Sequence, residues 1–201
     1  MVQLSPAAGS APRLGLSDRE GLAVRVTGVV QGVGFRPFVH RLAVRHQLDG
    51  WVLNAAGEVR IELEGTAGAL QEFLDALELE APPLARIERV EVERHEARGL
   101  RGFAIESSQD QPDRRQPVSP DVAVCAACEA ELRDPANRRF EYPFITCTDC
   151  GPRFTVINAM PYDRERTSMA AFSQCPACRA EYELPGSRRY HSETNSCFAC
   201  G

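Results

Sequence analysis

The stretch Gly28-Val29-Val30-Gln31-Gly32-Val33-Gly34-Phe35-Arg36 contains the turn that decides the fold of the first half of the chain. The residues leading into it, Leu22–Val30, are rich in valine and alternate in the way that is typical of a β-strand. The residues leading out of it, Arg36–Gln47, place apolar side chains at helical spacing, with a proline in the first turn where it is tolerated. The stretch therefore predicts a strand that passes through a glycine-containing turn directly into a helix.

The elements that follow complete a recognisable order. The patterns predict strands at Gly50–Asn54 and Glu58–Glu64, an amphipathic helix at Ala67–Leu79, a strand at Ile87–Glu93 and a final edge strand at Phe103–Glu106. The order β-α-β-β-α-β predicts an α+β domain of the ferredoxin-like type, an antiparallel sheet with two helices on one face. Because this fold carries many functions, the order alone does not identify an activity.

Composition divides the 201-residue chain into four expected segments. We expect a flexible tail at 1–20, the α+β domain at 21–108, a proline-containing linker at 109–124 and a cysteine-rich domain at 125–201. The net charge of −5 argues against nucleic acid or an anionic membrane as a partner. No segment approaches the apolar length of a membrane span, of about 20 residues, and residues 1–20 have no apolar run of the length that a signal peptide needs. We therefore predict a cytoplasmic location, where thiols stay reduced.

All eight cysteines lie in the last segment as four Cys-x2-Cys pairs, and the second two pairs repeat the first two with an offset of fifty residues. The predicted metal ligands are Cys125, Cys128, Cys147, Cys150, Cys175, Cys178, Cys197 and Cys200. Glu131 and Glu181 repeat at the same offset, as do Arg138-Arg139 and Arg188-Arg189. A duplicated unit, with repeats at 125–150 and 175–200, is the simplest explanation.

Two Cys-x2-Cys turns supply four thiolates that can surround one zinc ion at about 2.3 Å. We therefore predict two structural zinc ions, because zinc replaces the core that a segment of about forty residues can hardly build from side chains. Alternatives stay open: iron–sulfur clusters also use four cysteines, the two repeats can exchange pairs, and disulfides form in an oxidising compartment. A catalytic zinc is disfavoured because four thiolates leave no open position for water.

Other charged or metal-binding residue types are assigned ordinary roles. The histidines, His40, His46, His95 and His191, are expected at the surface or in packing positions, since the metal shells are already complete. The two arginine pairs are expected to be solvated, or to form salt bridges with a domain outside this chain.

The glycine-containing turn is also a candidate anion site. Glycine lets the backbone approach a ligand closely, and the amino end of a helix presents unpaired N–H groups to an anion. Arg36, in the first turn of the helix, can add a forked, charge-assisted contact to a phosphate. The stretch is neither a Walker loop nor a dinucleotide fingerprint, because the glycine spacing differs and the terminal Lys-Ser/Thr is missing.

Two motifs give this turn a resemblance to a known family. Gly28–Arg36 resembles the acylphosphatase signature G-x-V-Q-G-V-x-F-R, and Gly50-Trp51-Val52-Leu53-Asn54 resembles the second motif of that family, G-W-V-x-N. The resemblance implies that Arg36 binds the substrate phosphate with the backbone amides of residues 31–35, and that Asn54 positions the attacking water. It also implies a reaction without a metal or a covalent intermediate. The phosphate-binding residues would be Gln31, Gly32, Val33, Gly34, Phe35 and Arg36. The alternatives from the residues alone are a strand-capping Asn54 and a solvated Arg36.

The motifs and the cysteine array together resemble the amino-terminal part of the HypF-type carbamoyltransferases of nickel–iron hydrogenase maturation. Further matching blocks are 34–38, 150–155, 160–164 and 188–191, so the resemblance covers about residues 21–201. It implies that carbamoyl phosphate is hydrolysed at the acylphosphatase site. The carbamate is then adenylated with ATP in later domains and passed to HypE, where it becomes a cyanide ligand.

The later domains implied by this resemblance are not in the sequence, so we expect a fragment that carries out only the first step. The alternative is a non-catalytic, zinc-stabilised module that docks HypE or the missing domains. A zinc ribbon that binds nucleic acid is disfavoured by the acidic charge.

Overall fold

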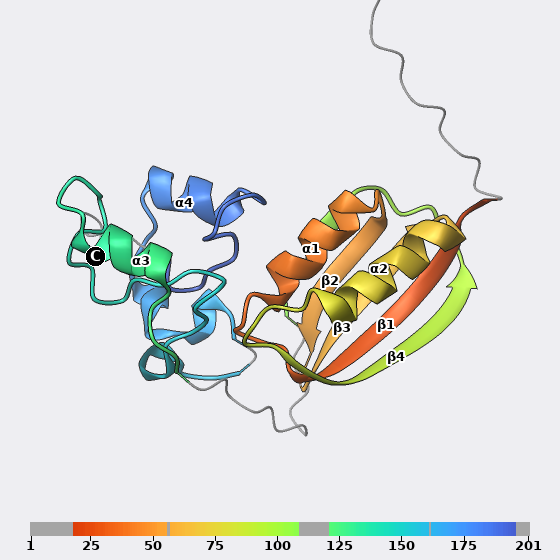
Figure 1. Ribbon diagram of the computed structural model, residues 1–201, viewed down its shortest axis with the longest axis horizontal. Coiled ribbons are helices and arrows are strands. Elements are labelled where there is room, and N and C mark those ends of the chain that lie inside the picture. Colours follow the sequence, from red (N-terminus) through yellow and green to blue (C-terminus); the bar gives the residue numbers. More distant parts are fainter. Residues whose placement is uncertain (1–17, 56, 109–120, 161, 196–201) are drawn as a thin grey trace, which may run out of the picture.

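The computed structural model describes residues 18–55, 57–108, 121–160 and 162–195, which form two lobes side by side (Figure 1). The first lobe contains five strands and two helices. The strands are β1 (Glu20–Val29), β2 (Asp49–Ala55), β3 (Glu58–Gly65), β4 (Arg86–Glu96) and β5 (Phe103–Ile105). The helices are α1 (Phe35–Arg45) and α2 (Ala67–Leu79), and both pack on the same face of the sheet. The predicted ferredoxin-like α+β fold is confirmed.

The sheet has the order β4-β1-β3-β2-β5. β1 pairs antiparallel with β3 and β4, and β3 pairs antiparallel with β2. The expectation of a wholly antiparallel sheet is wrong at its edge, because β5 pairs parallel with β2. The chain reverses after β4 and crosses the sheet to its other edge, so β5 has to run opposite to β4 and therefore along β2.

A buried glutamate fixes this crossing. The Glu64 carboxylate, at the end of β3, accepts hydrogen bonds from the backbone N–H groups of Arg98, Gly99 and Leu100 at 2.5, 2.9 and 2.8 Å. Its side chain is fully buried. A buried carboxylate requires such donors, and here the donors are the backbone groups of the crossing segment itself.

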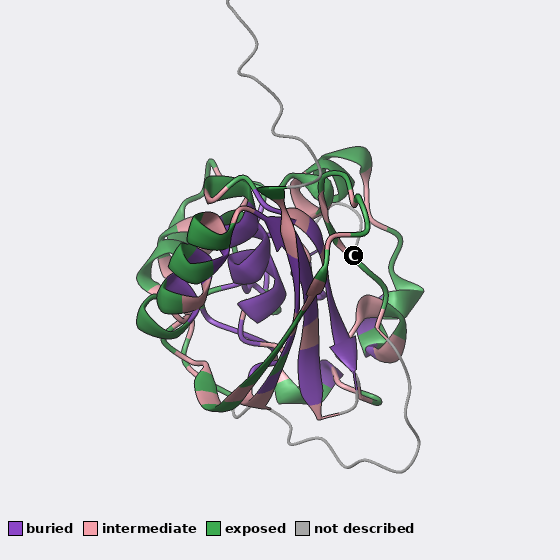
Figure 2. Cartoon of the chain, turned by 90° about the vertical axis from the view of Figure 1, so that its right-hand side faces the viewer, coloured by how far each residue is buried: buried purple, intermediate pink, exposed green. Residues whose placement is uncertain are grey.

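The core of the first lobe lies between the sheet and the two helices, where the buried residues gather in Figure 2. Alternate residues of β1 point into it, as the two-residue period of a strand requires. The helices contribute Phe35, Phe38, Leu42, Leu70 and Phe73. This packing holds the first turn of α1, and with it Arg36, against the end of the sheet.

The second lobe is built from two copies of one small unit. α3 (Ala126–Arg133) and α4 (Pro176–Glu183) each begin directly after the first cysteine of a repeat. The N–H of Glu141 donates to the carbonyl of Leu132, and the N–H of His191 donates to the carbonyl of Tyr182, fifty residues later. Glu141 and His191 also share a left-handed backbone, with φ of 56° and 49°. Three short 3-10 helices, η2 (Phe154–Val156), η3 (Arg164–Arg166) and η4 (Ser168–Ala171), lie between the copies in the chain.

The repeated arginine pairs are not solvated, and this expectation is wrong. Arg188 and Arg189 of the second repeat bind the Glu131 carboxylate of the first, each with an N–O distance of 2.6 Å. Arg138 and Arg139 of the first repeat bind Glu181 of the second in the same way. The pairs are internal because the two repeats pack against each other, which a local sequence pattern does not reveal. No described helix is long and apolar enough to cross a membrane.

Candidate active site and metal centre

The turn between β1 and α1 lies where the two lobes meet. Gly32 and Gly34 both have a left-handed backbone, with φ of 73° and 74°, and Gly34 is the N-cap of α1. A Cβ on Gly34 would lie 2.3 Å from the carbonyl oxygen of Thr148 in the second lobe. Glycine is therefore required here by the backbone conformation and by the close approach of the other lobe.

The Gln31 side chain connects this turn to the end of β2. Its amide nitrogen donates to the carbonyl oxygens of Ala55 and Glu58, at 2.8 and 3.0 Å. Both acceptors lie beside the connection between β2 and β3, so one buried side chain joins the first motif to the end of the strand that carries the second.

Asn54 lies next to this connection and is 1% exposed. Among the described residues, neither its amide oxygen nor its amide nitrogen has a hydrogen-bond partner. Leaving a buried polar group unpaired costs about 1–3 kcal/mol, so an unpaired buried amide that faces a cavity is suited to bind a small polar ligand. A strand-capping role would instead require a bond from this side chain to the backbone.

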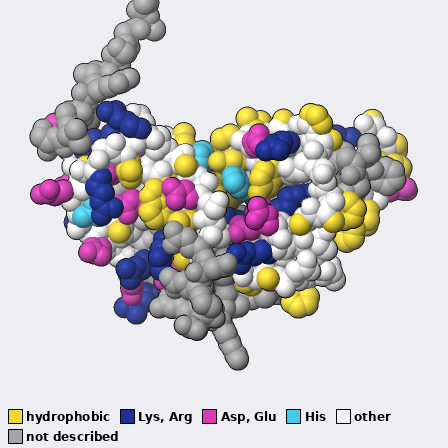
Figure 3. Space-filling view, turned by 180° about the vertical axis from the view of Figure 1, so that it is seen from behind, with side chains coloured by type: hydrophobic (Ala, Val, Ile, Leu, Met, Phe, Trp, Pro, Cys, Tyr) yellow, Lys and Arg dark blue, Asp and Glu magenta, His cyan; other side chains and the backbone are white. Residues whose placement is uncertain are grey.

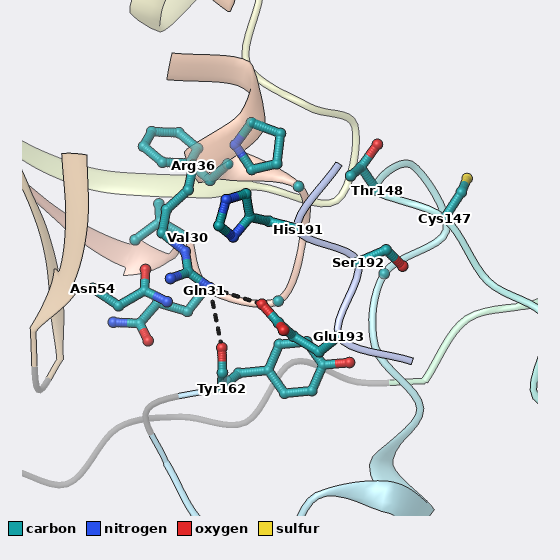
Figure 4. Close-up of a pocket in the computed structure, with 15 residues that line it drawn as sticks. Val30, Gln31, Arg36, Asn54, Cys147, Thr148, Tyr162, His191, Ser192 and Glu193 are labelled. Carbon is teal, nitrogen blue, oxygen red and sulfur yellow. Dashed lines mark hydrogen bonds and ion pairs between the residues drawn. The ribbon is translucent and has the colours of Figure 1, made fainter. Parts of the chain in front are cut away.

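Arg36, in the first turn of α1, points toward the second lobe (Figure 4). It is 7% exposed, so it is not a solvated helix residue. Its guanidinium lies 3.0 Å from a carboxylate oxygen of Asp163 and 3.2 Å from one of Glu193. It also donates to the carbonyl oxygen of Tyr162 at 3.2 Å and to the hydroxyl of Ser108 at 3.4 Å. Most of its partners thus come from the second lobe.

Arg36 and Asn54 line one small cavity with the predicted turn residues Gln31, Gly32, Gly34 and Phe35. Its volume is about 30 Å³, room for about two water molecules. Val33, also predicted to bind phosphate, is buried in the core of the first lobe. The second lobe closes the cavity with Cys147, Thr148, Gly151, Tyr162, His191, Ser192 and Glu193. A larger cleft opens beside it, and acidic, basic and histidine side chains gather there, where the lobes meet (Figure 3).

The second lobe controls the electrostatics of this cavity. Burial raises the pKa of Glu193 to about 7, against the opposing effect of Arg36. Burial lowers the pKa of His191 to about 4, and Arg36 acts in the same direction. His191 is therefore neutral at pH 7, and its ring lies against those of Tyr182 and Tyr190.

Asp163, His191 and Glu193 were not predicted as site residues. Two of them lie in the blocks 160–164 and 188–191, which contribute to the family resemblance but contain no metal ligand. Glu193 could have been noticed by comparing the two repeats, because its counterpart fifty residues earlier is Pro143. The carboxylate is therefore present in one copy of the repeat and absent from the other.

The first set of cysteines forms a compact cluster. The sulfur atoms of Cys125, Cys128, Cys147 and Cys150 all lie within 4.8 Å of one another. Three of the separations are 3.7, 3.9 and 3.9 Å. A tetrahedral shell with zinc–sulfur bonds of about 2.3 Å has edges of about 3.8 Å, so the donor set fits zinc with ligands from one repeat. In the second repeat, Cys175 and Cys178 are described, whereas Cys197 and Cys200 lie outside the described residues.

Arginine side chains surround the thiol groups. One guanidinium nitrogen of Arg188 lies 3.7, 3.8 and 3.6 Å from the sulfur atoms of Cys125, Cys128 and Cys147. Arg138 occupies the equivalent place in the second repeat, 3.5 Å from the sulfur of Cys178. Each cation therefore lies over the cysteines of the repeat to which it does not belong.

Comparisons with known proteins divide the chain in a consistent way. The acylphosphatase family model matches residues 22–105, and the HypF finger model matches 124–157 and 175–201. The chain is 53% identical to carbamoyltransferase HypF2 of Cupriavidus necator, over 76% of this chain and 19% of that protein. It is 43% identical to an acylphosphatase of Salinibacter ruber, over 42% of this chain and 90% of that protein.

The chain is similar to a crystal structure of full-length HypF in the phosphate- and nucleotide-bound form, with a TM-score of 0.86 and 40% sequence identity. The match covers 96% of this chain and 25% of that protein. The chain thus spans about a fifth of the HypF relatives that it matches.

Proposed function

The chain belongs to the acylphosphatase family, with a HypF finger joined to its acylphosphatase domain, and we propose on that basis that it hydrolyses carbamoyl phosphate in the cavity between its lobes. One observation carries the proposal: Arg36, at the start of α1, and Asn54, near the end of β2, line the same buried cavity. A cation for the phosphate and an unpaired amide for a water are the two groups that the reaction needs.

In the proposed reaction, the substrate phosphate binds to Arg36 and to the N–H groups of residues 31–35 at the amino end of the helix. Asn54 positions a water whose oxygen forms a bond to phosphorus while the bond from phosphorus to the acyl oxygen breaks. The water proton passes to a phosphate oxygen, and carbamate leaves. Because the leaving group is good, positioning and charge neutralisation can supply most of the rate.

We propose that the finger lobe holds two zinc ions, one per repeat. The fit of Cys125, Cys128, Cys147 and Cys150 to a tetrahedral shell supports the first. The fifty-residue repeat supports the second, which Cys175, Cys178, Cys197 and Cys200 would hold. Zinc with four thiolate ligands has no open position, so it would stabilise the lobe and take no part in the chemistry.

The proposal extends to the whole protein of which this sequence would be a part. There, carbamate is adenylated with ATP in domains outside this chain and transferred to a HypE-type protein, for synthesis of the cyanide ligands of nickel–iron hydrogenase. We also propose a cytoplasmic location and the division into 1–20, 21–108, 109–124 and 125–201. The HypF relatives and the composition support these points.

A second candidate function is a non-catalytic module that docks HypE or the remaining domains. The contact of Asp163 and Glu193 with Arg36 favours it, because these carboxylates occupy the cation that the substrate would need. The two candidates differ in whether phosphate is released from an acyl phosphate.

A phosphate-release assay with carbamoyl phosphate and acetyl phosphate tests the proposal. Arg36→Ala and Asn54→Ala should each lower kcat/KM by about 100-fold or more, as the loss of a charge-stabilising contact does in other enzymes. Arg41→Ala is the matched control, since Arg41 lies exposed on the same helix and should leave the activity unchanged. Turnover that is unaffected by Arg36→Ala and Asn54→Ala would contradict the assignment, and no phosphate release at all would favour the docking module.

A further inference from the structure

The Glu193 carboxylate is held in the way that a phosphate would be held. One oxygen lies 3.2 Å from the Arg36 guanidinium. The other accepts hydrogen bonds from the backbone N–H of Arg164 at 3.0 Å and from the hydroxyl of Tyr182 at 2.9 Å. A guanidinium, a backbone N–H and a hydroxyl are also the donors that bind phosphate oxygens in proteins. The Glu193 side chain is 1% exposed, so this is an interior contact.

The second finger repeat presents this carboxylate to the first lobe. Asn195, two residues later, donates from its amide to the carbonyl oxygen of Cys178 at 2.7 Å, which fixes the segment to the repeat. The backbone carbonyl of Glu193 accepts a bond of 2.7 Å from the Arg164 side chain. Since the first repeat has Pro143 at the equivalent position, the carboxylate is not required by the fold of the repeat itself.

The charges around Arg36 oppose the binding of a further anion. Its single positive charge faces the carboxylates of both Asp163 and Glu193. An incoming phosphate dianion would be repelled at this distance unless one carboxylate moves away. The cavity of about 30 Å³ points the same way, because a phosphate with its acyl group is several times larger than a water molecule. The adjoining cleft, also lined by Arg36, is large enough to receive the substrate.

We propose that Glu193 is a specificity-determining residue of the acyl phosphate site: its carboxylate takes the place of the substrate phosphate on Arg36, and an anion binds only by displacing it. Selectivity follows from this competition, because a ligand has to offer Arg36 a stronger contact than a carboxylate does. A phosphate dianion meets that condition, and a simple carboxylate does not. The proposal rests on the proposed function for the identity of the substrate.

The test replaces Glu193 by glutamine in the complete chain and measures two quantities. These are the Kd of inorganic phosphate, by isothermal titration calorimetry, and the KM and kcat for acetyl phosphate. Measured at about pH 8, where the Glu193 carboxylate is mostly ionised, removing this competing charge should lower Kd and KM by about tenfold and leave kcat within about twofold. If Glu193 instead positions Arg36, Kd and KM rise or kcat falls, and that outcome overturns the proposal, as do unchanged values.

Further variants keep the test decisive. Glu129→Gln removes the same charge from an exposed position in the finger lobe and should change neither constant. Tyr182→Phe keeps every charge but removes one donor to the Glu193 carboxylate, so it should shift Kd in the same direction by a smaller factor. Tyr182→Phe replaces Glu193→Gln in the test if Glu193→Gln loses zinc or its circular dichroism signal. In that case an unchanged phosphate Kd in Tyr182→Phe would overturn the proposal. Absence of hydrolysis in every variant refutes the proposed function, whereas the phosphate Kd still decides the role of Glu193.

Discussion

Replacing Arg188 by alanine should weaken metal binding in the first repeat, to which Arg188 does not belong. A zinc ion with four thiolates carries two negative charges in excess, and one guanidinium nitrogen lies 3.6–3.8 Å from three of the sulfur atoms. The other terminal nitrogen binds Glu131 at 2.6 Å, which holds the cation in place. The side chain therefore supplies both charge and orientation to the metal shell.

The size of the effect follows from two bounds. Two opposite unit charges at about 4 Å attract by about 4 kcal/mol at an effective dielectric constant of about 20. The Arg188 side chain is 32% exposed, so solvent screens much of this attraction. Loss of an outer contact to metal ligands commonly lowers affinity by about 10- to 100-fold, or about 1.4–2.8 kcal/mol. We expect a value in that range.

The assay is competition for zinc with a chromophoric chelator, which resolves the two sites by their affinities. Arg188→Ala should release one zinc per chain at about 10- to 100-fold lower chelator concentration than the unmodified chain. Arg133→Ala is the control, because Arg133 is exposed and forms an ion pair with Glu129 on its own helix. Arg138→Ala should affect the second repeat instead. Identical release curves for Arg188→Ala and the unmodified chain would refute the reasoning.

Three further outcomes are expected. Metal analysis should return two zinc ions per chain, and a result of iron or of no metal would contradict the cysteine assignment. Complete removal of zinc should abolish the circular dichroism signal of α3 and α4 while the first lobe stays folded. Glu64→Ala should lower the free energy of unfolding of the first lobe by about 3 kcal/mol, since three backbone N–H groups lose their acceptor. The fluorescence of Trp51 in β2 measures this unfolding. An effect no larger than that of Glu93→Ala, at an exposed position, would contradict the role of Glu64 in holding the crossing segment. Because burial raises the pKa of Glu193 to about 7, its carboxylate is mostly neutral below that pH and ionised above it. The ratio of KM in the unmodified chain to KM in Glu193→Gln should therefore increase between about pH 6 and pH 8, and a constant ratio would mean that Glu193 does not titrate there.

The strands and helices of the first lobe follow from local patterns. The alternation in Leu22–Val30 and the helical spacing in Ala67–Leu79 each reflect the side chains that face the core, and both elements form near the expected bounds. The direction of β5 could not be obtained in this way. It depends on where the chain crosses the sheet, and that crossing depends on Glu64, thirty-four residues or more before the N–H groups it binds.

The candidate site, like the fold, could be predicted where it rests on local sequence and not where it rests on contacts between distant residues. Gly28–Arg36 and Gly50–Asn54 could be found in the sequence because each is a short continuous motif. The contact of Glu193 with Arg36 joins residues 157 positions apart and exists only because the lobes pack together. A motif reports which groups a segment carries, whereas the groups that face it across an interface depend on the whole fold.

The exchange of arginines between the repeats has a consequence for how such a lobe can change over time. In a string of independent fingers, one unit can be lost, copied or replaced without altering its neighbours. Here Arg138 and Arg188 each carry the counter-charge for the other unit's sulfur atoms. Deleting either unit would leave the survivor with an unneutralised cluster and an arginine facing solvent. We therefore expect the two units to be kept or lost together.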